Sequence, residues 1–89
     1  MIGIAEEVIN GLQKIGANDL SNDDKLLINR SLFEINSRYS AFADSNDVEK
    51  HHEMTLGRCF KEQGEYVAEV LIDKKVKAAV VRVKAHPLA

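Results

Sequence analysis

The sequence predicts an all-α fold: a small bundle of three helices, or four if the third breaks, with a long C-terminal helix completed by oligomerisation. Apolar residues recur at helical spacing in three segments. The only proline, Pro87, lies close to the end, so no earlier position is barred from a helix on that ground. With 89 residues the chain has room for one core. We therefore expect a single helical domain over residues 1–89.

The first predicted helix covers about residues 4–15. Its apolar residues are spaced three, four and three apart and form one stripe: Ala5, Val8, Leu12 and Ile15. Acidic residues occupy the first turn and Lys14 the last, an arrangement that the helix macrodipole favours. Gly16 follows as the predicted left-handed C-cap.

The second predicted helix opens at Ser21, whose hydroxyl can accept from N–H groups of the first turn. Asp24, three residues later, takes the place of the capping-box acid. The helix carries the best periodic seam in the chain: Ile28, Leu32, Ile35, Tyr39 and Phe42. Leu26 and Phe33 widen the apolar surface beyond that seam. This helix is therefore expected to contact two neighbours.

The third predicted helix follows a turn at residues 44–47 and runs to about residue 84. Its stripe includes His52, Leu56 and Cys59. Gly57 and Gly64 are each unfavourable by about 1 kcal/mol relative to Ala, so a break there would give four helices. Unbroken, the helix would reach about 58 Å at ~1.5 Å per residue, more than the rest of the chain can cover. A homo-oligomer, in the first instance a dimer, is therefore expected.

The residues expected to make the contact between copies are those of the C-terminal apolar run. They are Tyr66, Val70, Ile72, Val76, Ala79, Val80 and Val83.

The same region admits an alternative, an α+β fold with a C-terminal hairpin at about 66–84. Seven of the twenty residues from 65 to 84 are β-branched, and Asp73-Lys74-Lys75 could turn the hairpin. However, that tripeptide lacks the Gly or Asn that tight hairpin turns prefer. Alternation also fails at residues 78–81, and Asp73 and Lys77 form a helical i,i+4 pair. The helix is the favoured interpretation.

The end of the chain is basic. Five basic residues and no acid follow Asp73: Lys74, Lys75, Lys77, Arg82 and Lys84. They suggest an alternative function, a nucleic-acid-binding module in which segment 74–84 contacts phosphates. A solvated helix face is the favoured interpretation, because the net charge is −2 and the segment has no aromatic residue for base stacking.

Residues able to carry chemistry are few. Glu49 and His52 share a helix face at i,i+3, but a metal site would need a second copy of that motif from a symmetric dimer. Cys59 lies on the apolar stripe and is expected to be a buried hydrophobe rather than a nucleophile. Glycine-rich phosphate loops and nucleophile elbows are absent from the sequence. We predict that the protein is not an enzyme and uses no catalytic residue, metal or cofactor.

The predicted function follows from these exclusions. No run of about 18 apolar residues is present, so no membrane is expected as a partner. A single cysteine fits a reducing cytoplasm. We expect a small cytoplasmic homo-oligomeric protein that binds or regulates a macromolecular partner, another protein, through a helical surface. The stripes are generic to helical bundles and indicate no family.

Overall fold

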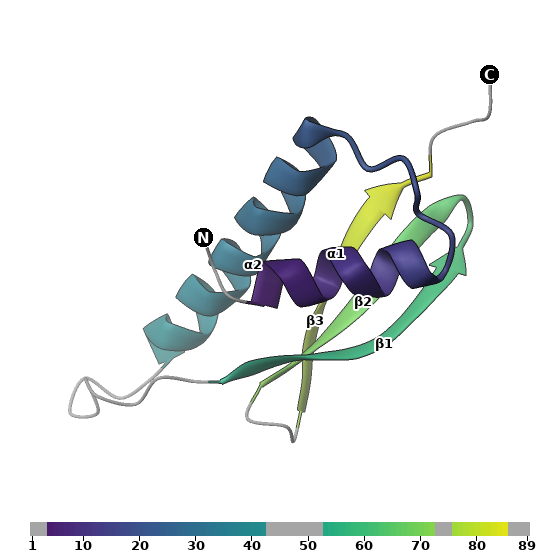
Figure 1. Cartoon of the computed structure of the whole chain (residues 1–89). Helices are drawn as coiled ribbons and strands as arrows, with labels where there is room; N and C mark the ends of the chain where they lie inside the picture. The colour runs from purple at the N-terminus through teal and green to yellow at the C-terminus, as the bar shows by residue number, and fades with distance from the viewer. Residues whose placement is uncertain (1–3, 43–52, 73–75, 86–89) are drawn as a thin grey trace.

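The computed structural model describes residues 4–42, 53–72 and 76–85, without the side chains of residues 39–42 and 76–78. Two helices precede a three-stranded antiparallel sheet (Figure 1). The elements are α1 (Ile4–Lys14), α2 (Asn22–Phe42), β1 (Met54–Glu62), β2 (Glu65–Ile72) and β3 (Val76–Lys84). The strands are ordered β1-β2-β3, so β2 is central.

The all-α prediction is therefore wrong, because the segment expected as the third helix forms the sheet of an α+β fold. The alternative hairpin at about 66–84 corresponds to β2 and β3, whereas β1 belongs to neither interpretation. The physical reason is that an apolar run such as 66–72 is compatible both with a buried helix and with a central strand that is buried on both faces. This run forms a strand because it pairs with β1 along one edge and with β3 along the other.

The predicted first helix is confirmed as α1. Its buried side chains are Ile4, Ala5, Val8 and Leu12, of which the last three belong to the predicted stripe, whereas Ile15 is half-buried. Gly16 has a φ of 113°, and its N–H donates to the carbonyl of Gln13. The N–H of Ala17 donates to the carbonyl of Leu12 at 3.0 Å. Together these bonds form a Schellman motif, so the predicted left-handed cap is also confirmed.

The start of α2 is confirmed with its cap. The backbone N–H of Asp24 donates to the hydroxyl of Ser21 at 3.1 Å, and the N–H of Ser21 donates to the Asp24 carboxylate at 3.0 Å. This reciprocal pair satisfies two N–H groups at the helix start. Of the predicted seam, Ile28, Leu32 and Ile35 are buried, whereas the side chains of Tyr39 and Phe42 lie outside the described part.

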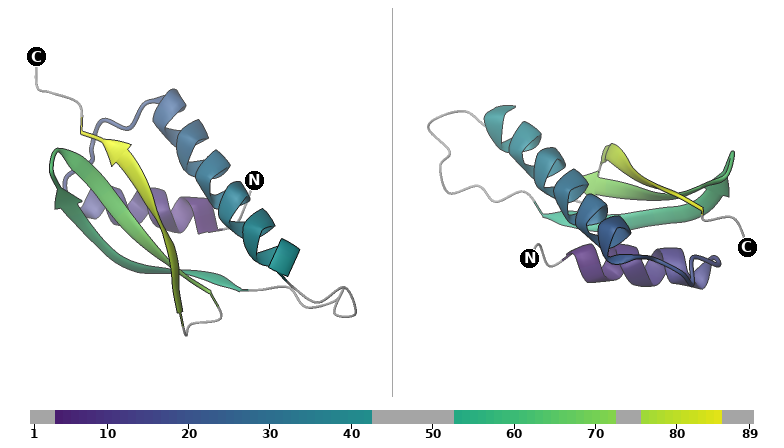
Figure 2. Two further views of the ribbon diagram at one scale, coloured as in Figure 1. Left: turned by 180° about the vertical axis from the view of Figure 1, so that it is seen from behind. Right: turned by 90° about the horizontal axis from the view of Figure 1, so that it is seen from above.

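Both helices pack on one face of the sheet (Figure 2). α1 lies over β1 and β2, and α2 packs against β3 and α1. The sheet contributes alternate residues to this core: Ala68, Val70, Ile72, Val81 and Val83. Gly11 allows α1 to approach β1 closely, because a Cβ there would lie 2.8 Å from the Cys59 sulfur and 2.9 Å from Leu56 Cδ2.

A two-residue turn joins β1 to β2. Gln63 has a φ of 50° and Gly64 a φ of 78°, the two positive values that a type I′ hairpin turn requires. The carbonyl of Gly64 also accepts from the N–H of Ala85 at 2.8 Å, which continues the pairing beyond β3. Gly64, which lowers the helix propensity of its segment, thus supplies one of the positive φ values that the hairpin turn requires.

Candidate interaction surfaces

The first candidate surface is the outer face of the sheet, turned away from both helices. β1 bulges between Leu56 and Cys59, which places Arg58 beside the central strand. The Arg58 Nε donates to Glu69 Oε1 at 2.9 Å. The Glu69 side chain is only 6% exposed, whereas that of Arg58 is 81% exposed. The hydrogen bond and the charge of Glu69 raise the pKa of Arg58, so the guanidinium stays charged.

An aromatic ring and a second group of charges complete this face. The Arg58 guanidinium carbon lies 5.8 Å from the centroid of the Phe60 ring, within cation–π range. Towards the hairpin turn, the Arg82 Nη1 lies 3.6 Å from Glu65 Oε1 and 3.9 Å from Glu62 Oε2. Val67 lies in register between Phe60 and Arg82 and is fully buried, although it does not belong to the core beneath α1 and α2. Both arginines of the outer face have carboxylate partners.

A shallow depression beside this pair is lined by Arg58, Cys59 and Phe60 and has a volume of about 510 Å³. It is open to solvent rather than enclosed. Small-molecule sites bury most of their ligand in a concave pocket, so this depression does not have the form of such a site.

The predicted basic surface is dispersed by the strand structure. Lys74 and Lys75 lie outside the described residues, and so does the side chain of Lys77. Arg82 is held by two carboxylates, and exposed Lys84 lies in register with Glu65. The described part of segment 74–84 therefore offers no continuous basic helix face.

The residues predicted to hold two copies together mostly serve the core of one chain. Val70, Ile72 and Val83 are buried there, and Tyr66 and Ala79 pack partly against it. Val80 is half-buried and lies in register with Glu69, while the side chain of Val76 is outside the described part. The apolar excess that suggested an oligomer is thus largely used within the chain, because strand alternation directs it towards the helices.

The residues considered for metal binding or nucleophilic chemistry are Glu49, His52 and Cys59. Glu49 and His52 lie outside the described residues. Within the described ranges, no three His, Cys, Asp or Glu side chains are grouped so as to hold a metal ion. Cys59 lies under α1, where burial first and the charge of Glu69 second raise the pKa of its thiol. A raised pKa lowers the thiolate fraction, which is unfavourable for a nucleophile.

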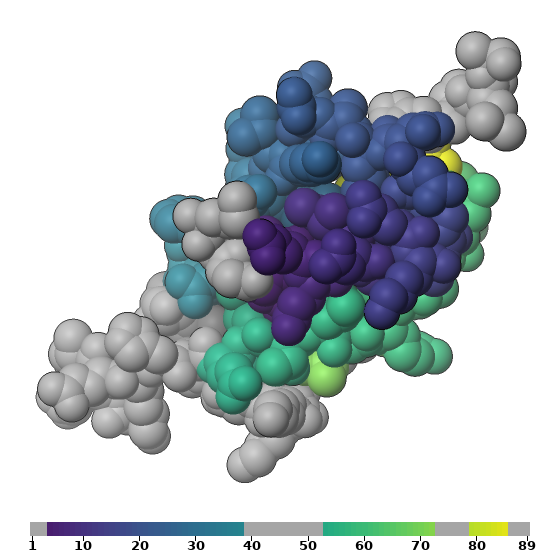
Figure 3. Space-filling model, viewed as in Figure 1, coloured from purple at the N-terminus to yellow at the C-terminus, as the bar shows by residue number. Residues whose placement is uncertain are grey.

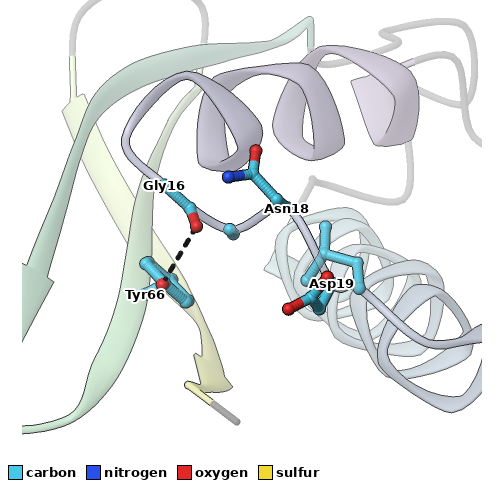
Figure 4. A pocket seen from close by; sticks show the side chains of 6 residues that line it. Gly16, Asn18, Asp19 and Tyr66 are labelled. Atoms are coloured by element: carbon cyan, nitrogen blue, oxygen red, sulfur yellow. Dashed lines mark hydrogen bonds between the residues drawn. The ribbon is translucent and has the colours of Figure 1, made fainter. Parts of the chain in front are cut away.

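A small cavity lies where the α1–α2 connection meets the sheet (Figure 4). It has a volume of about 30 Å³ and is lined by residues 16–20 and Tyr66. The Tyr66 hydroxyl donates to the carbonyl of Gly16 at 3.2 Å. This volume admits about one water molecule, so the contact ties the connection to β2 rather than forming a ligand site.

The second candidate surface lies on α2. The large apolar side chains that the described part of the chain exposes all belong to this helix: Leu26 at 62%, Leu27 at 42% and Phe33 at 63%. Leu26 and Phe33 are two turns apart on the side opposite the buried seam. Arg30, also exposed, lies between them. We call Leu26, Arg30 and Phe33 the outer stripe of α2.

Among the described residues, no helix or strand covers the outer stripe. α2 packs with one side towards β3 and α1, and its other side is open (Figure 2). In the space-filling view, α2 and α1 form adjoining parts of the surface (Figure 3). α2 thus has the two neighbours that the sequence predicts, β3 and α1, and Leu26 and Phe33 nevertheless remain exposed.

Comparisons with known proteins do not name a function. No known family, curated protein or solved structure matches the chain. Neither helix of the described ranges is both long and apolar enough to cross a membrane. Function is therefore inferred from the surfaces of the chain itself.

Proposed function

We propose that this chain is a non-enzymatic binding protein that docks onto another protein through the outer stripe of α2. The supporting observation is the exposure of Leu26 and Phe33, 62% and 63%, on one side of a regular helix. Large apolar side chains at helical spacing on an exposed helix face are typical of helices that dock onto another protein. Burying the two side chains in an interface would contribute about 1–2 kcal/mol each.

A protein fits this surface better than a nucleic acid. The outer stripe has one arginine between two apolar side chains, whereas affinity for phosphates comes from several basic groups acting together. On the sheet, Arg58 and Arg82 already have carboxylate partners. The chain as a whole carries a net charge of −2.

The proposal places the protein in the cytoplasm, where the lone thiol of Cys59 needs no disulfide partner. It does not require the homo-oligomer expected from the sequence, because the C-terminal apolar residues that suggested one are largely buried within a single chain.

The proposal is tested by affinity capture with three forms of the full chain. The wild type is compared with Leu26→Asp/Phe33→Asp and with Asn10→Asp/Gln13→Asp, which adds the same charge to the exposed side of α1. Thermal unfolding confirms that each form is folded. We expect proteins captured by the wild type and the α1 control to be lost with the α2 variant.

Two results would contradict the proposal. Recovery of the same proteins with all three forms would show that the outer stripe is not the docking surface. Recovery that is unaffected by the α2 variant but abolished by nuclease and by salt would favour the nucleic-acid alternative.

A further inference from the structure

We infer that Arg30 selects the occupant of the outer stripe: it keeps out a second copy of this chain and accepts a helix that presents a carboxylate opposite it. This inference rests on the proposed function, since it concerns the same surface. It adds the chemistry of the partner, an amphipathic helix with an acidic residue between two apolar anchors.

Any partner that binds over the outer stripe also contacts Arg30. At 100° per residue, Leu26, Arg30 and Phe33 fall within about 60° of one another around the helix axis. Arg30 is one turn from each of the two apolar side chains, so a partner that covers both also contacts the Arg30 side chain. Within the described residues no carboxylate forms an ion pair with Arg30. A charge that is covered without a partner is strongly unfavourable, so a partner that brings a carboxylate to Arg30 is favoured over one that does not.

A second copy of α2 does not supply this carboxylate in the arrangements that pair both apolar side chains of the stripe. A parallel two-fold pair places each residue opposite itself, so Arg30 meets Arg30 of the other copy. An antiparallel pair that sets Leu26 against the other Phe33 has its axis between residues 29 and 30. That arrangement also brings the two Arg30 side chains together. Like charges at the centre of a contact oppose association.

A shifted register does not resolve the conflict. Antiparallel helices can place Arg30 opposite Glu34 of the second copy. The same shift places Leu26 opposite exposed Arg38, so the apolar contact is lost. The chain thus has complementary charge in one register and complementary apolar surface in another. A partner with both in one register would be preferred over self-pairing.

The test is a charge swap between full-length chains, read by sedimentation equilibrium at high protein concentration. In the Arg30→Glu variant, α2 carries an acidic residue between Leu26 and Phe33, so the variant presents the features that we infer for the partner helix. We expect wild type and variant each to stay monomeric, and their mixture to associate at least about tenfold more tightly than either alone. High concentration is needed because the stripe is smaller than the ~800 Å² per partner of standard interfaces.

A second variant and a control sharpen the result. Arg30→Leu removes the charge and joins the two anchors, so this form is expected to self-associate. Adding Leu26→Asp/Phe33→Asp to either partner should abolish association of the mixture, and added salt should weaken it.

Two outcomes would overturn the inference. Association of the wild type through the stripe as tightly as the mixture would show that a second copy is the occupant. Association of the mixture and of Arg30→Leu no tighter than that of the wild type would show that Arg30 selects nothing. Both are distinct from failure of the proposed function, which is read from the capture experiment with Leu26→Asp/Phe33→Asp.

Discussion

The two helices are both amphipathic, but only one of them is fully explained by the fold. α1 turns its large apolar side chains towards the sheet and exposes polar ones: Glu6, Glu7, Asn10, Gln13 and Lys14. α2 buries Ile28, Leu32 and Ile35 on one side and exposes Leu26, Leu27 and Phe33 elsewhere. The difference is that α1 uses its apolar side chains in the core, whereas α2 also carries large apolar side chains that the described part of the chain leaves exposed.

The largest expected effect compares the two sides of α2. Leu32 is fully buried, so Leu32→Ala should lower the free energy of unfolding by about 2–5 kcal/mol. Leu26 is 62% exposed, so Leu26→Ala should change it by no more than about 0.5 kcal/mol. Urea denaturation of both variants measures the contrast. Similar losses for the two would mean that the outer stripe belongs to the fold.

The second prediction concerns the close approach of α1 to β1. Gly11→Ala should destabilise the protein by about 1–3 kcal/mol through overpacking, despite alanine's higher helix propensity. The cost should be smaller in a Cys59→Ala background, because the sulfur that would lie 2.8 Å from the new Cβ is gone. A double-mutant cycle in urea measures this coupling, with exposed Asn10→Ala as the control. Stabilisation by Gly11→Ala in both backgrounds would show that the helix is not this close.

The third prediction concerns the start of α2. Ser21→Ala removes the acceptor of the Asp24 N–H and should lower the free energy of unfolding by about 1 kcal/mol. Ser37→Ala, at an exposed position within the same helix, should be neutral or slightly stabilising. Thermal unfolding distinguishes the two. Equal effects would mean that the hydroxyl of Ser21 contributes nothing as a cap.

The smallest expected effect is a pH dependence from Cys59. Because the folded protein raises the pKa of this thiol above its ordinary value of 9.0, it favours the protonated form. The resulting stability is present below that ordinary value and is lost as the pH rises through the higher pKa of the folded state. The urea midpoint of wild type should therefore fall more between neutral and alkaline pH than that of Cys59→Ala. Parallel curves would show that the thiol is not perturbed.

The outer stripe shows how far a surface can be predicted from a sequence. Leu26 and Phe33 stand outside the seam of Ile28, Leu32 and Ile35, and this is visible from spacing alone because both sets lie on one helix. The Arg58–Glu69 pair has no such signal. Its partners are eleven residues apart and meet only through the register of two strands and a bulge between Leu56 and Cys59.

The sequence by itself determined α1, the start of α2 and their caps, because residues three to five positions apart decide these features. The Schellman motif at Gly16 and the Ser21–Asp24 pair depend on nothing beyond their own turn. Only the tertiary structure decided residues 54–84. An apolar run such as 66–72 is compatible with a buried helix or a central strand, and the choice depends on partners along both edges. Hydrogen bonds between strands join distant residues, so no local spacing records them.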